Sequence, residues 1–481
     1  MNHKWFPLRR GIVVLGLASL ACQTVMGPAT ATVWTPLPAP SSTAPSTPGV
    51  TASPEGSPTP LPELLTTDRT YLGSLTLIQS KLPLGDCKQQ SPFDLPTDGL
   101  VQVAYVPTQV CFNGEIGLLE IRDRLYVVQS AGYLGAFMLT DVTDPSRPEF
   151  IGAWEWKEAT YTSDVKTFRQ ADRSYLVLSM EAQGFASGPG EPCGIAIVEV
   201  TDPRAPQLIG NYHGQAVGST AHWCNVHTVE VDADAHGDGN YLLVSSDDTA
   251  DLRVVDIRDL SRVREVGRYR SPKLEFDSSG TAKTFVHDTT IVGDRVYVSY
   301  WAGGLVILDK ASLESGVEAA SLNEPGSIAP EGFDVHYGYP TTNGNFVFIE
   351  DEVNYNPPDF SQLRLWDIRD LSAPKEVLAL KLDNALSPPH NLLVEGDLLY
   401  VGWYQDGVRV YRYDVSRPDN PVVEPAFAQP VRAARGTGVF GSGIFDGIYG
   451  VRLHGCEAKG KATTCIYASD LTRGLLILAL P

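Results

Sequence analysis

Four histidines stand at matching points of a repeated sequence pattern: His227, His287, His336 and His390. Neutral imidazole is a common ligand of Zn, Cu and Fe, and a carboxylate such as Asp164 could support it. If the fold brings these side chains to one level, they could hold a transition metal or act as acids and bases. The alternative is that His is a recurring filler of the repeat, hydrogen-bonded to water or to backbone. We favour this alternative.

An acidic turn is a second candidate cation site. It offers four oxygen-bearing side chains at close spacing: Asp232, Asp234, Asp238 and Asn240. The turn resembles calcium loops of the form D-x-D-x-[DN]-G. Such loops suit Ca²⁺, because this ion prefers oxygen ligands and the glycine allows the sharp turn that brings them together. His236 replaces an expected oxygen ligand, and Leu243 stands where an EF-hand has its bidentate Glu. We therefore favour an acidic turn that solvates a hairpin.

Several function classes are disfavoured. The chain of 481 residues has 57 Asp plus Glu against 37 Lys plus Arg, a net charge of −20, whereas nucleic-acid binding needs a basic face. It has no G-x-S-x-G nucleophile elbow, no H-E-x-x-H and no phosphate-binding loop. The sequence therefore favours a binding module over an enzyme and leaves the question of activity open.

The candidate residues belong to a repeat of about fifty residues. Each unit holds short β-rich runs and Gly-Asp turns such as Gly293-Asp294, which predict hairpins. Four strands per unit are typical of a propeller blade. We count seven units, with six or eight as the alternatives: 115–156, 164–213, 225–270, 286–322, 333–382, 389–428 and 446–479. The sequence predicts an all-β, seven-bladed β-propeller of four-stranded blades.

The last unit lacks a fourth strand, because the chain ends soon after its third, Gly474–Leu478. An N-terminal β-rich segment, Tyr71–Ile78, could pair with that strand and remove an exposed edge. We therefore expect Tyr71–Ile78 to close the ring. The weakest strand assignment is the fourth strand of the fourth blade, around Gly316–Leu322.

The first strand of each blade should line the central channel. Counting back from the Gly-Asp turns places one residue of each blade at the channel end: Ile116, Asp164, His227, His287, His336, His390 and Tyr449. The loops between second and third strands should surround the same end, with Glu350-Asp351-Glu352 and Asp247-Asp248 among them and with aromatic Trp301, Trp403 and Tyr404. These aromatic residues would bind a protein, peptide or glycan by stacking on apolar faces. The rival hypothesis is a metal-dependent extracytoplasmic hydrolase or oxidase that uses the histidines.

Two segments resemble a known repeat family. Gly304–Asp309 and Gly194–Pro203 look like the LVIVD repeat of bacterial surface propellers, and the chain is similar to the choice-of-anchor B group that carries such repeats. The resemblance covers about residues 70–481. It implies a propeller at the cell surface but no specific activity, because this fold hosts both binders and enzymes.

The N-terminus has the pattern of an export signal. Lys4, Arg9 and Arg10 precede the apolar stretch Gly11–Ala21. Ser19-Leu20-Ala21-Cys22 resembles a bacterial lipobox, although Ser19 departs from its usual large aliphatic residue. We therefore predict a lipoprotein signal peptide at 1–21, with Cys22 lipidated in the cell envelope and facing outward. The alternative is cleavage after Ala31 and secretion.

A tether and a disulfide framework complete the prediction. Residues 22–66 are rich in Pro, Thr and Ser, which predicts a disordered tether before the propeller at 67–481. Six cysteines remain besides Cys22, and sequence proximity favours three pairs: Cys87–Cys111, Cys193–Cys224 and Cys456–Cys465. Such pairs are typical of oxidising compartments.

Overall fold

The computed structural model describes most of the chain after residue 67. The described residues are 68–70, 75–78, 91–110, 112–132, 135–156, 161–181, 193–214, 223–246, 249–270, 284–314, 318–321, 334–352, 363–383, 385–431 and 445–481. The predicted signal peptide, Cys22 and the tether lie outside them. No helix in this described part of the chain has the length and apolar character needed to cross a bilayer.

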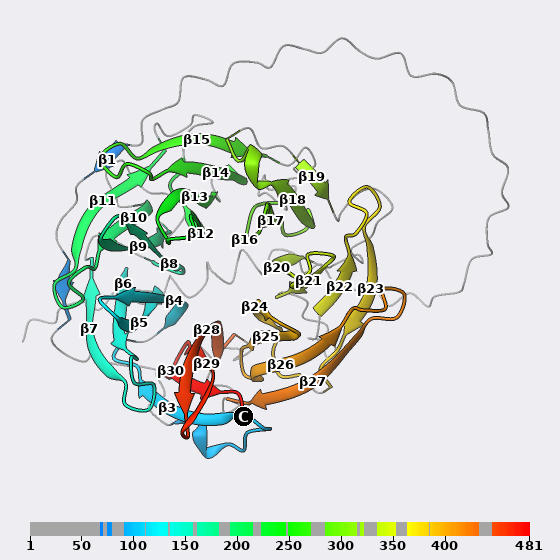
Figure 1. Ribbon diagram of the computed structural model, residues 1–481. Coiled ribbons are helices and arrows are strands. Elements are labelled where there is room, and N and C mark those ends of the chain that lie inside the picture. Colours follow the sequence, from blue (N-terminus) through cyan, green and yellow to red (C-terminus); the bar gives the residue numbers. More distant parts are fainter. Residues whose placement is uncertain are drawn as a thin grey trace, which may run out of the picture. The chain divides into compact units, whose positions relative to one another are not determined.

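Seven antiparallel sheets form a ring, as the repeat predicts (Figure 1). Blades 1 and 2 contain, from the channel outward, β4 (Asn113–Ile121), β5 (Arg124–Ala131), β6 (Ala136–Asp141) and β7 (Glu149–Glu155), then β8 (Val165–Gln170), β9 (Arg173–Met180), β10 (Gly194–Glu199) and β11 (Gln207–His213). Blades 3 and 4 contain β12 (Val226–Ala233), β13 (Gly239–Ser246), β14 (Asp251–Asp256) and β15 (Arg264–Tyr269), then β16 (Asp288–Val292), β17 (Arg295–Ser299), β18 (Leu305–Asp309) and β19 (Glu318–Ser321). The expected fourth strand of blade 4 is therefore present as β19.

The ring continues in the same way. Blades 5 and 6 contain β20 (Val335–Pro340), β21 (Phe346–Asp351), β22 (Leu363–Asp367) and β23 (Lys375–Leu380), then β24 (His390–Glu395), β25 (Leu398–Trp403), β26 (Gly407–Asp414) and β27 (Val422–Gln429). Blade 7 contains β28 (Ile448–Ala458), β29 (Lys461–Asp470) and β30 (Gly474–Ala479), with β3 (Val101–Pro107) as its outer strand. Short 3₁₀ helices lie at Pro92–Asp94 and Lys310–Ser312.

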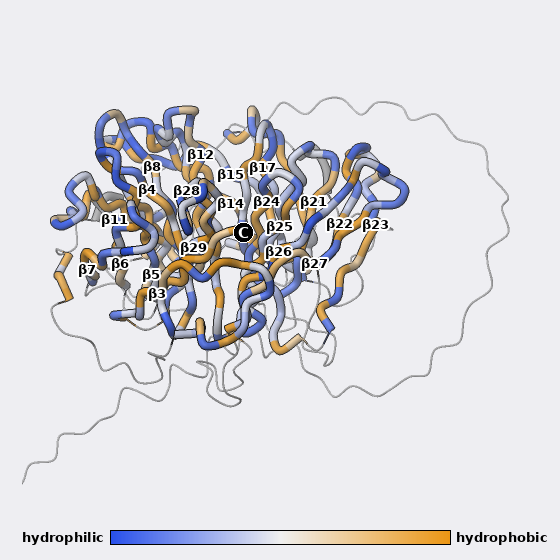
Figure 2. Tube along the Cα trace, turned by 60° about the horizontal axis from the view of Figure 1, so that its bottom comes forward, coloured by the Kyte–Doolittle hydropathy of each residue, from blue (hydrophilic) through white to orange (hydrophobic). Residues whose placement is uncertain are grey.

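The core lies between neighbouring blades. The first cluster joins Val128 and Leu139 of blade 1 to Val165, Leu176 and Ala196 of blade 2, and all five are buried. Hydrophobic residues follow the strands, whereas hydrophilic residues gather at the turns (Figure 2). Burial between faces explains why the strands read as apolar runs bounded by turn residues.

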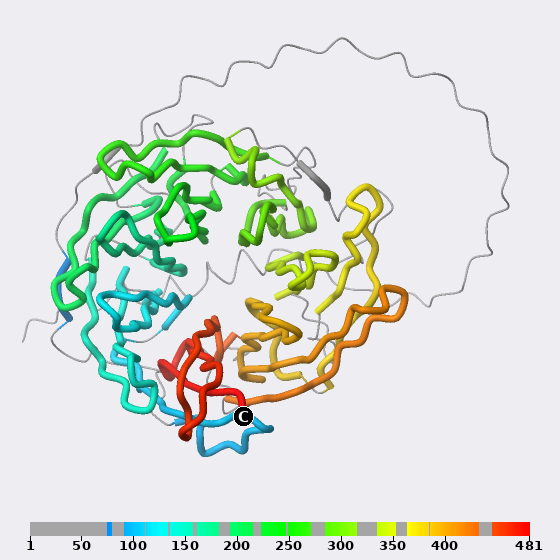
Figure 3. Tube along the Cα trace, viewed as in Figure 1, coloured from blue at the N-terminus to red at the C-terminus, as the bar shows by residue number. Residues whose placement is uncertain are grey.

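An N-terminal strand closes the ring, but it is not the predicted one. β3 pairs antiparallel with β30, with Val101 opposite Ala479 and Tyr105 opposite Leu476, so the two ends of the domain lie side by side (Figure 3). The segment that we expected to close the ring contributes only β2 (Thr76–Leu77), which pairs with β7 of blade 1. The short β1 (Asp68–Thr70) pairs with β11 of blade 2. β3 takes the closing position because it offers seven consecutive residues and packs apolar side chains onto the blade 7 core.

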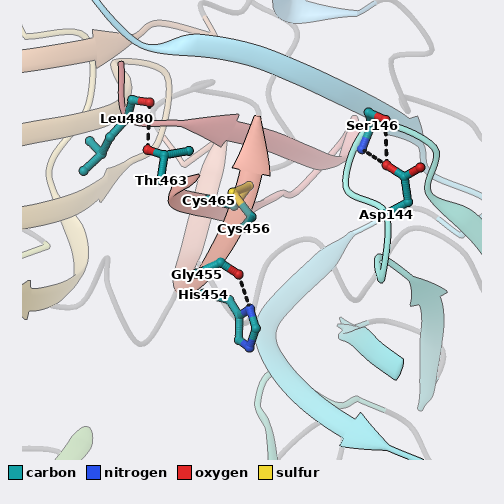
Figure 4. The surroundings of a disulfide bond; sticks show 8 residues. All are labelled: Asp144, Ser146, His454, Gly455, Cys456, Thr463, Cys465 and Leu480. Carbon is teal, nitrogen blue, oxygen red and sulfur yellow. Dashed lines mark hydrogen bonds between the residues drawn. A yellow bond between two sulfur atoms is a disulfide. The ribbon is translucent and has the colours of Figure 1, made fainter. Parts of the chain in front are cut away.

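Two of the three predicted disulfides are formed. Cys193 bonds to Cys224, and Cys456 bonds to Cys465 across the β28–β29 hairpin (Figure 4). Cys87 and Cys111 lie outside the described residues. Disulfides of this kind indicate an oxidising, extracytoplasmic environment.

Replacing both Cys456 and Cys465 with Ala should lower the free energy of unfolding by about 2–3 kcal/mol, because the crosslink closes a short loop in the unfolded chain. The β28–β29 backbone pairing over the whole hairpin should keep the native fold. Urea denaturation of the variant and the oxidised wild type measures the effect. An unchanged midpoint would show that the hairpin is equally constrained without the bond.

Candidate functional site

The first strands of the blades begin at one end of the channel, which we call the channel mouth. A cavity of about 10 Å³ lies there, with room for about one water molecule. All seven blades contribute to its lining, blades 1, 5 and 7 with one residue each and the others with two: Glu115, Ser163, Asp164, His227, Thr228, His287, Asp288, His336, His390, Asn391 and Tyr449. The predicted convergence of the four histidines is therefore present in the structure.

β-Bulges help to aim these side chains into the channel. The pairing register shifts in the first hairpin of several blades, between Val226 and Val229, between Val335 and Tyr337, and between His390 and Leu392. A bulge turns an additional residue of a strand toward the same face. Two consecutive residues of one strand, such as His227 and Thr228 or His390 and Asn391, can therefore both face the channel.

The four imidazoles form a continuous arc. Ring centroids are 4.5 Å apart between His227 and His287, 4.2 Å between His287 and His336, and 4.4 Å between His336 and His390. Tyr449 extends the arc at 4.0 Å from His390. Histidines on adjacent blades are therefore close enough to bind one ligand together.

Three of the imidazoles are oriented through Nδ1. His227 Nδ1 lies 2.5 Å from Glu181 Oε1, His390 Nδ1 lies 2.6 Å from the Tyr449 carbonyl oxygen, and His336 Nδ1 contacts Glu350 Oε1. An Nδ1–H group that donates to such an acceptor leaves Nε2 as the free ligand nitrogen. The arrangement therefore favours Nε2 ligation.

Burial keeps the inner histidines neutral. It lowers the pKa of His287 and of His336 well below the usual value, and neighbouring imidazoles lower both further. Burial also lowers the pKa of His390 to about 3. Neutral imidazole is the form that binds metals.

Two carboxylates besides Glu181 adjoin the arc. Burial raises the pKa of Glu350 well above its usual value, and the charges of Glu352 and Asp351 raise it further. Burial raises the pKa of Glu352 to about 7, although the Tyr404 hydroxyl donates to this carboxylate. Glu352 Oε2 lies 3.5 Å from His336 Nε2, and Glu352 Oε1 lies 3.9 Å from His390 Nε2.

Charged pairs occupy the channel below the arc. Lys166 Nζ lies 2.6 Å from Asp164 Oδ1, and Arg452 lies 3.4 Å from Glu115. The Asn391 side-chain amide donates to Glu115. The predicted supporting oxygen of Asp164 therefore bonds to Lys166 and to the Val229 amide rather than facing the arc.

Two predicted mouth residues need correction. Ile116 is fully buried in the core between blades 7 and 1, and Glu115 faces the channel instead. The register shift between Asn113 and Ile116 moves the strand by one position, which counting from the turn does not reveal. Trp403 is also wrong as a rim residue, because its side chain is fully buried and its indole nitrogen donates to the Ser387 carbonyl oxygen at 2.8 Å.

The other aromatic predictions lie at the mouth. Trp301 is partly exposed and stacks on His287 with ring centroids 4.7 Å apart. Tyr404 lies beneath the surface, 5.0 Å from the His390 ring. Asp247 and Asp248 lie outside the described residues.

The acidic turn does not gather its side chains around a common point. Asp232 pairs with Lys310 at 2.5 Å, whereas Asp234 accepts hydrogen bonds from the His236 and Asp238 amides. These backbone bonds lower the pKa of Asp234. Asn240 reaches Asp232 at 3.4 Å. The geometry matches a solvated turn better than a calcium site.

Sequence reasoning placed Glu350 and Glu352 around this end of the channel but assigned no carboxylate to a particular histidine. Glu181 and Glu352 directly follow second strands and Glu350 lies at the end of one, so their place on the same face was predictable. Their pairing with individual histidines depends on side-chain geometry across blades. The acidic run that ends the second strand of the His336 blade could have found Glu350 and Glu352, whereas Glu181 follows the second strand of the blade that precedes His227.

A known repeat family matches segments of blades 3 and 4. The LVIVD repeat family model matches residues 238–271 and 286–312, which span β13–β15 of blade 3 and β16–β18 of blade 4. No curated protein matches the chain significantly. The sheet order and these matches together show a seven-bladed β-propeller that carries LVIVD repeats, a fold that commonly serves protein interaction or scaffolding.

Proposed function

We propose that this protein is an exported, lipid-anchored propeller that binds a surface protein, peptide or glycan at its channel mouth. The disulfides support export, and the lipobox-like sequence before Cys22 supports the anchor. Secretion after cleavage is the alternative location. Mass spectrometry of the mature N-terminus, with Cys22→Ser as the comparison, distinguishes the two.

One observation carries the binding proposal. Three non-glycine residues with positive φ lie at the mouth, namely Trp301, Tyr404 and Asn391. Such backbone costs about 1–3 kcal/mol per residue and persists where the surroundings impose it, most often at functional sites. In Trp301 it holds a partly exposed indole beside the arc, where a flat apolar face of a partner can stack.

The surroundings suit a partner with polar or positive groups. The side chains of His227 and Glu181 at the mouth remain 22% and 25% exposed and form a pair. A hydrogen-bonding partner could therefore reach them beside the indole. The larger hollow of about 930 Å³ lies at the other end of β28, among residues such as Asp144 and His454 (Figure 4), and has no comparable aromatic and imidazole cluster.

The Trp301→Ala variant should bind its partner at least about 30-fold more weakly, because a central aromatic contact commonly contributes about 2 kcal/mol or more. Glycan and peptide arrays probed with the full chain would identify the strongest ligand, and calorimetry would compare variants. Leu77→Ala is the control, because Leu77 is 45% exposed but lies on the outer edge of blade 1. Equal affinities for all three proteins would place the binding site elsewhere.

A second candidate function is a metal-dependent extracytoplasmic hydrolase or oxidase. The observation that favours it is the convergence of imidazole and carboxylate groups at the mouth. Chemistry of this kind first requires that the site hold an ion. Substrate screens are informative only for protein whose metal content is known.

A further inference from the structure

We propose that His287, His336 and Glu352 bind one divalent transition-metal ion, of which Zn²⁺ is the representative, at the channel mouth. The inference goes beyond partner binding and does not depend on it, because the ion would be held by imidazole nitrogens and a carboxylate and not by the Trp301 indole.

The distances suit a single ion. Each of the three residues offers a ligand atom, and these atoms all lie within 4.8 Å of one another. Ligand bonds of about 2.0–2.1 Å in tetrahedral geometry put neighbouring donor atoms roughly 3.3 Å apart. His336 Nε2 and Glu352 Oε2 are already 3.5 Å apart, so this pair needs only a small contraction.

Hydrogen bonding leaves nitrogen atoms available to a metal. His336 Nε2 and His287 Nδ1 are buried and have no hydrogen-bond partner, whereas buried polar atoms in proteins almost always have one. Nε2 of His336 faces the Glu352 carboxylate, and the opposite ring nitrogen contacts Glu350. A carboxylate–His–metal arrangement has this order of groups, in which the outer carboxylate fixes the tautomer and the ring orientation.

The negative charge of the two carboxylates also favours a bound cation. Glu350 is fully buried and the Glu352 side chain is 13% exposed, and no Lys or Arg within the described ranges forms an ion pair with either of them. Buried carboxylates are normally balanced by a cation or by protonation. A divalent ion would satisfy the carboxylate and the free imidazole nitrogens together. The competing state is a protonated Glu352 that donates to His336.

The donor set indicates the metal class. Two imidazoles with one carboxylate suit Zn²⁺ and neighbouring transition metals, whereas Ca²⁺ and Mg²⁺ prefer oxygen ligands alone. Three protein ligands leave a fourth position for water or for a ligand. His390 Nε2 lies 3.9 Å from Glu352 Oε1 and is therefore a candidate for that position.

The test is a Zn²⁺ titration of the chelator-treated full chain by calorimetry, with Co²⁺ absorption as a report on the coordination. We expect about one ion per chain in the wild type. Glu352→Gln and His287→Ala should each bind more than about 100-fold more weakly, and Glu350→Gln about 10–100-fold more weakly through its effect on His336.

His454→Ala is the matched control, because His454 pairs with Glu120 at 3.2 Å at the far end of blade 7 and is expected to keep full affinity for Zn²⁺. Circular dichroism checks folding, and Glu352→Gln, which preserves shape, decides the result if the alanine variant does not fold. Failure of a folded wild type to bind Zn²⁺, or equal binding by Glu352→Gln, overturns the proposal. Trp301→Ala should lose the partner and keep the metal, so the two proposals fail separately.

Discussion

A chain that starts at residue 112 is expected to lose the closed ring, whereas a chain that starts at residue 91 should keep it. The longer chain contains β3, which forms the fourth strand of blade 7, and the shorter one does not. Without β3, the apolar strand Gly474–Ala479 would present unpaired N–H and C=O groups at an open edge, which promotes aggregation. Val101, Ala104 and Val106 would also be lost from the core between blades 7 and 1.

Size-exclusion chromatography and thermal unfolding of the two chains measure the effect, with Cys111→Ser in the longer chain to avoid an unwanted thiol. Both chains lack β1 and β2, so the longer one also tests the closure that we first expected. Its stability should be close to that of the full chain, because β2 pairs over only two residues and leaves Leu77 exposed. A monomeric, equally stable chain from residue 112 would mean that β3 does not close the ring.

The difference between these two closures shows what sequence could predict. Repetition predicts blades, because every unit contains the same apolar runs and turns. The choice among N-terminal segments is a pairing across more than 360 residues of sequence, between Val101 and Ala479. Local residue patterns in Tyr71–Ile78 and Val101–Pro107 both favour strands, so only packing against blade 7 decides between them.

The channel mouth shows the same limit on a smaller scale. Counting back from the turns placed His227, His287, His336 and His390 together, because each stands six to eight residues before the turn of its hairpin. The count failed by one in blade 1, where a bulge puts Glu115 rather than Ile116 into the channel. Bulges depend on how two strands meet, and the local sign of this one is Gly114, since a glycine within a strand favours a bulge or a close backbone approach.

The aromatic pairs at the mouth follow a rule that emerges only from the structure. In Tyr300-Trp301 and in Trp403-Tyr404, the first residue is fully buried, and its polar atom donates to a neighbouring carbonyl group. The second residue has positive φ and bridges to the next blade, Trp301 to Val335 and Tyr404 to Ile448. Position within the pair, not residue type, therefore decides which ring reaches the mouth.

Trp403→Ala should accordingly lower the free energy of unfolding by about 3–5 kcal/mol, because it removes a large buried side chain from the core between blades 5 and 6. It also leaves the buried Ser387 carbonyl group without its indole donor. Trp301→Ala should cost less than about 1 kcal/mol, because that indole is partly exposed. Urea denaturation of both variants measures the difference.

Trp403→Phe separates the two contributions to the larger loss. Phe restores most of the apolar volume but not the N–H donor, so its deficit should be about 1–3 kcal/mol, the cost of a stranded buried acceptor. If Trp403→Ala were instead as stable as wild type and lost partner binding, its ring would have to lie at the mouth. The expected pattern is a loss of stability for Trp403→Ala and a loss of affinity for Trp301→Ala. It would assign the first position of each aromatic pair to folding and the second position to recognition.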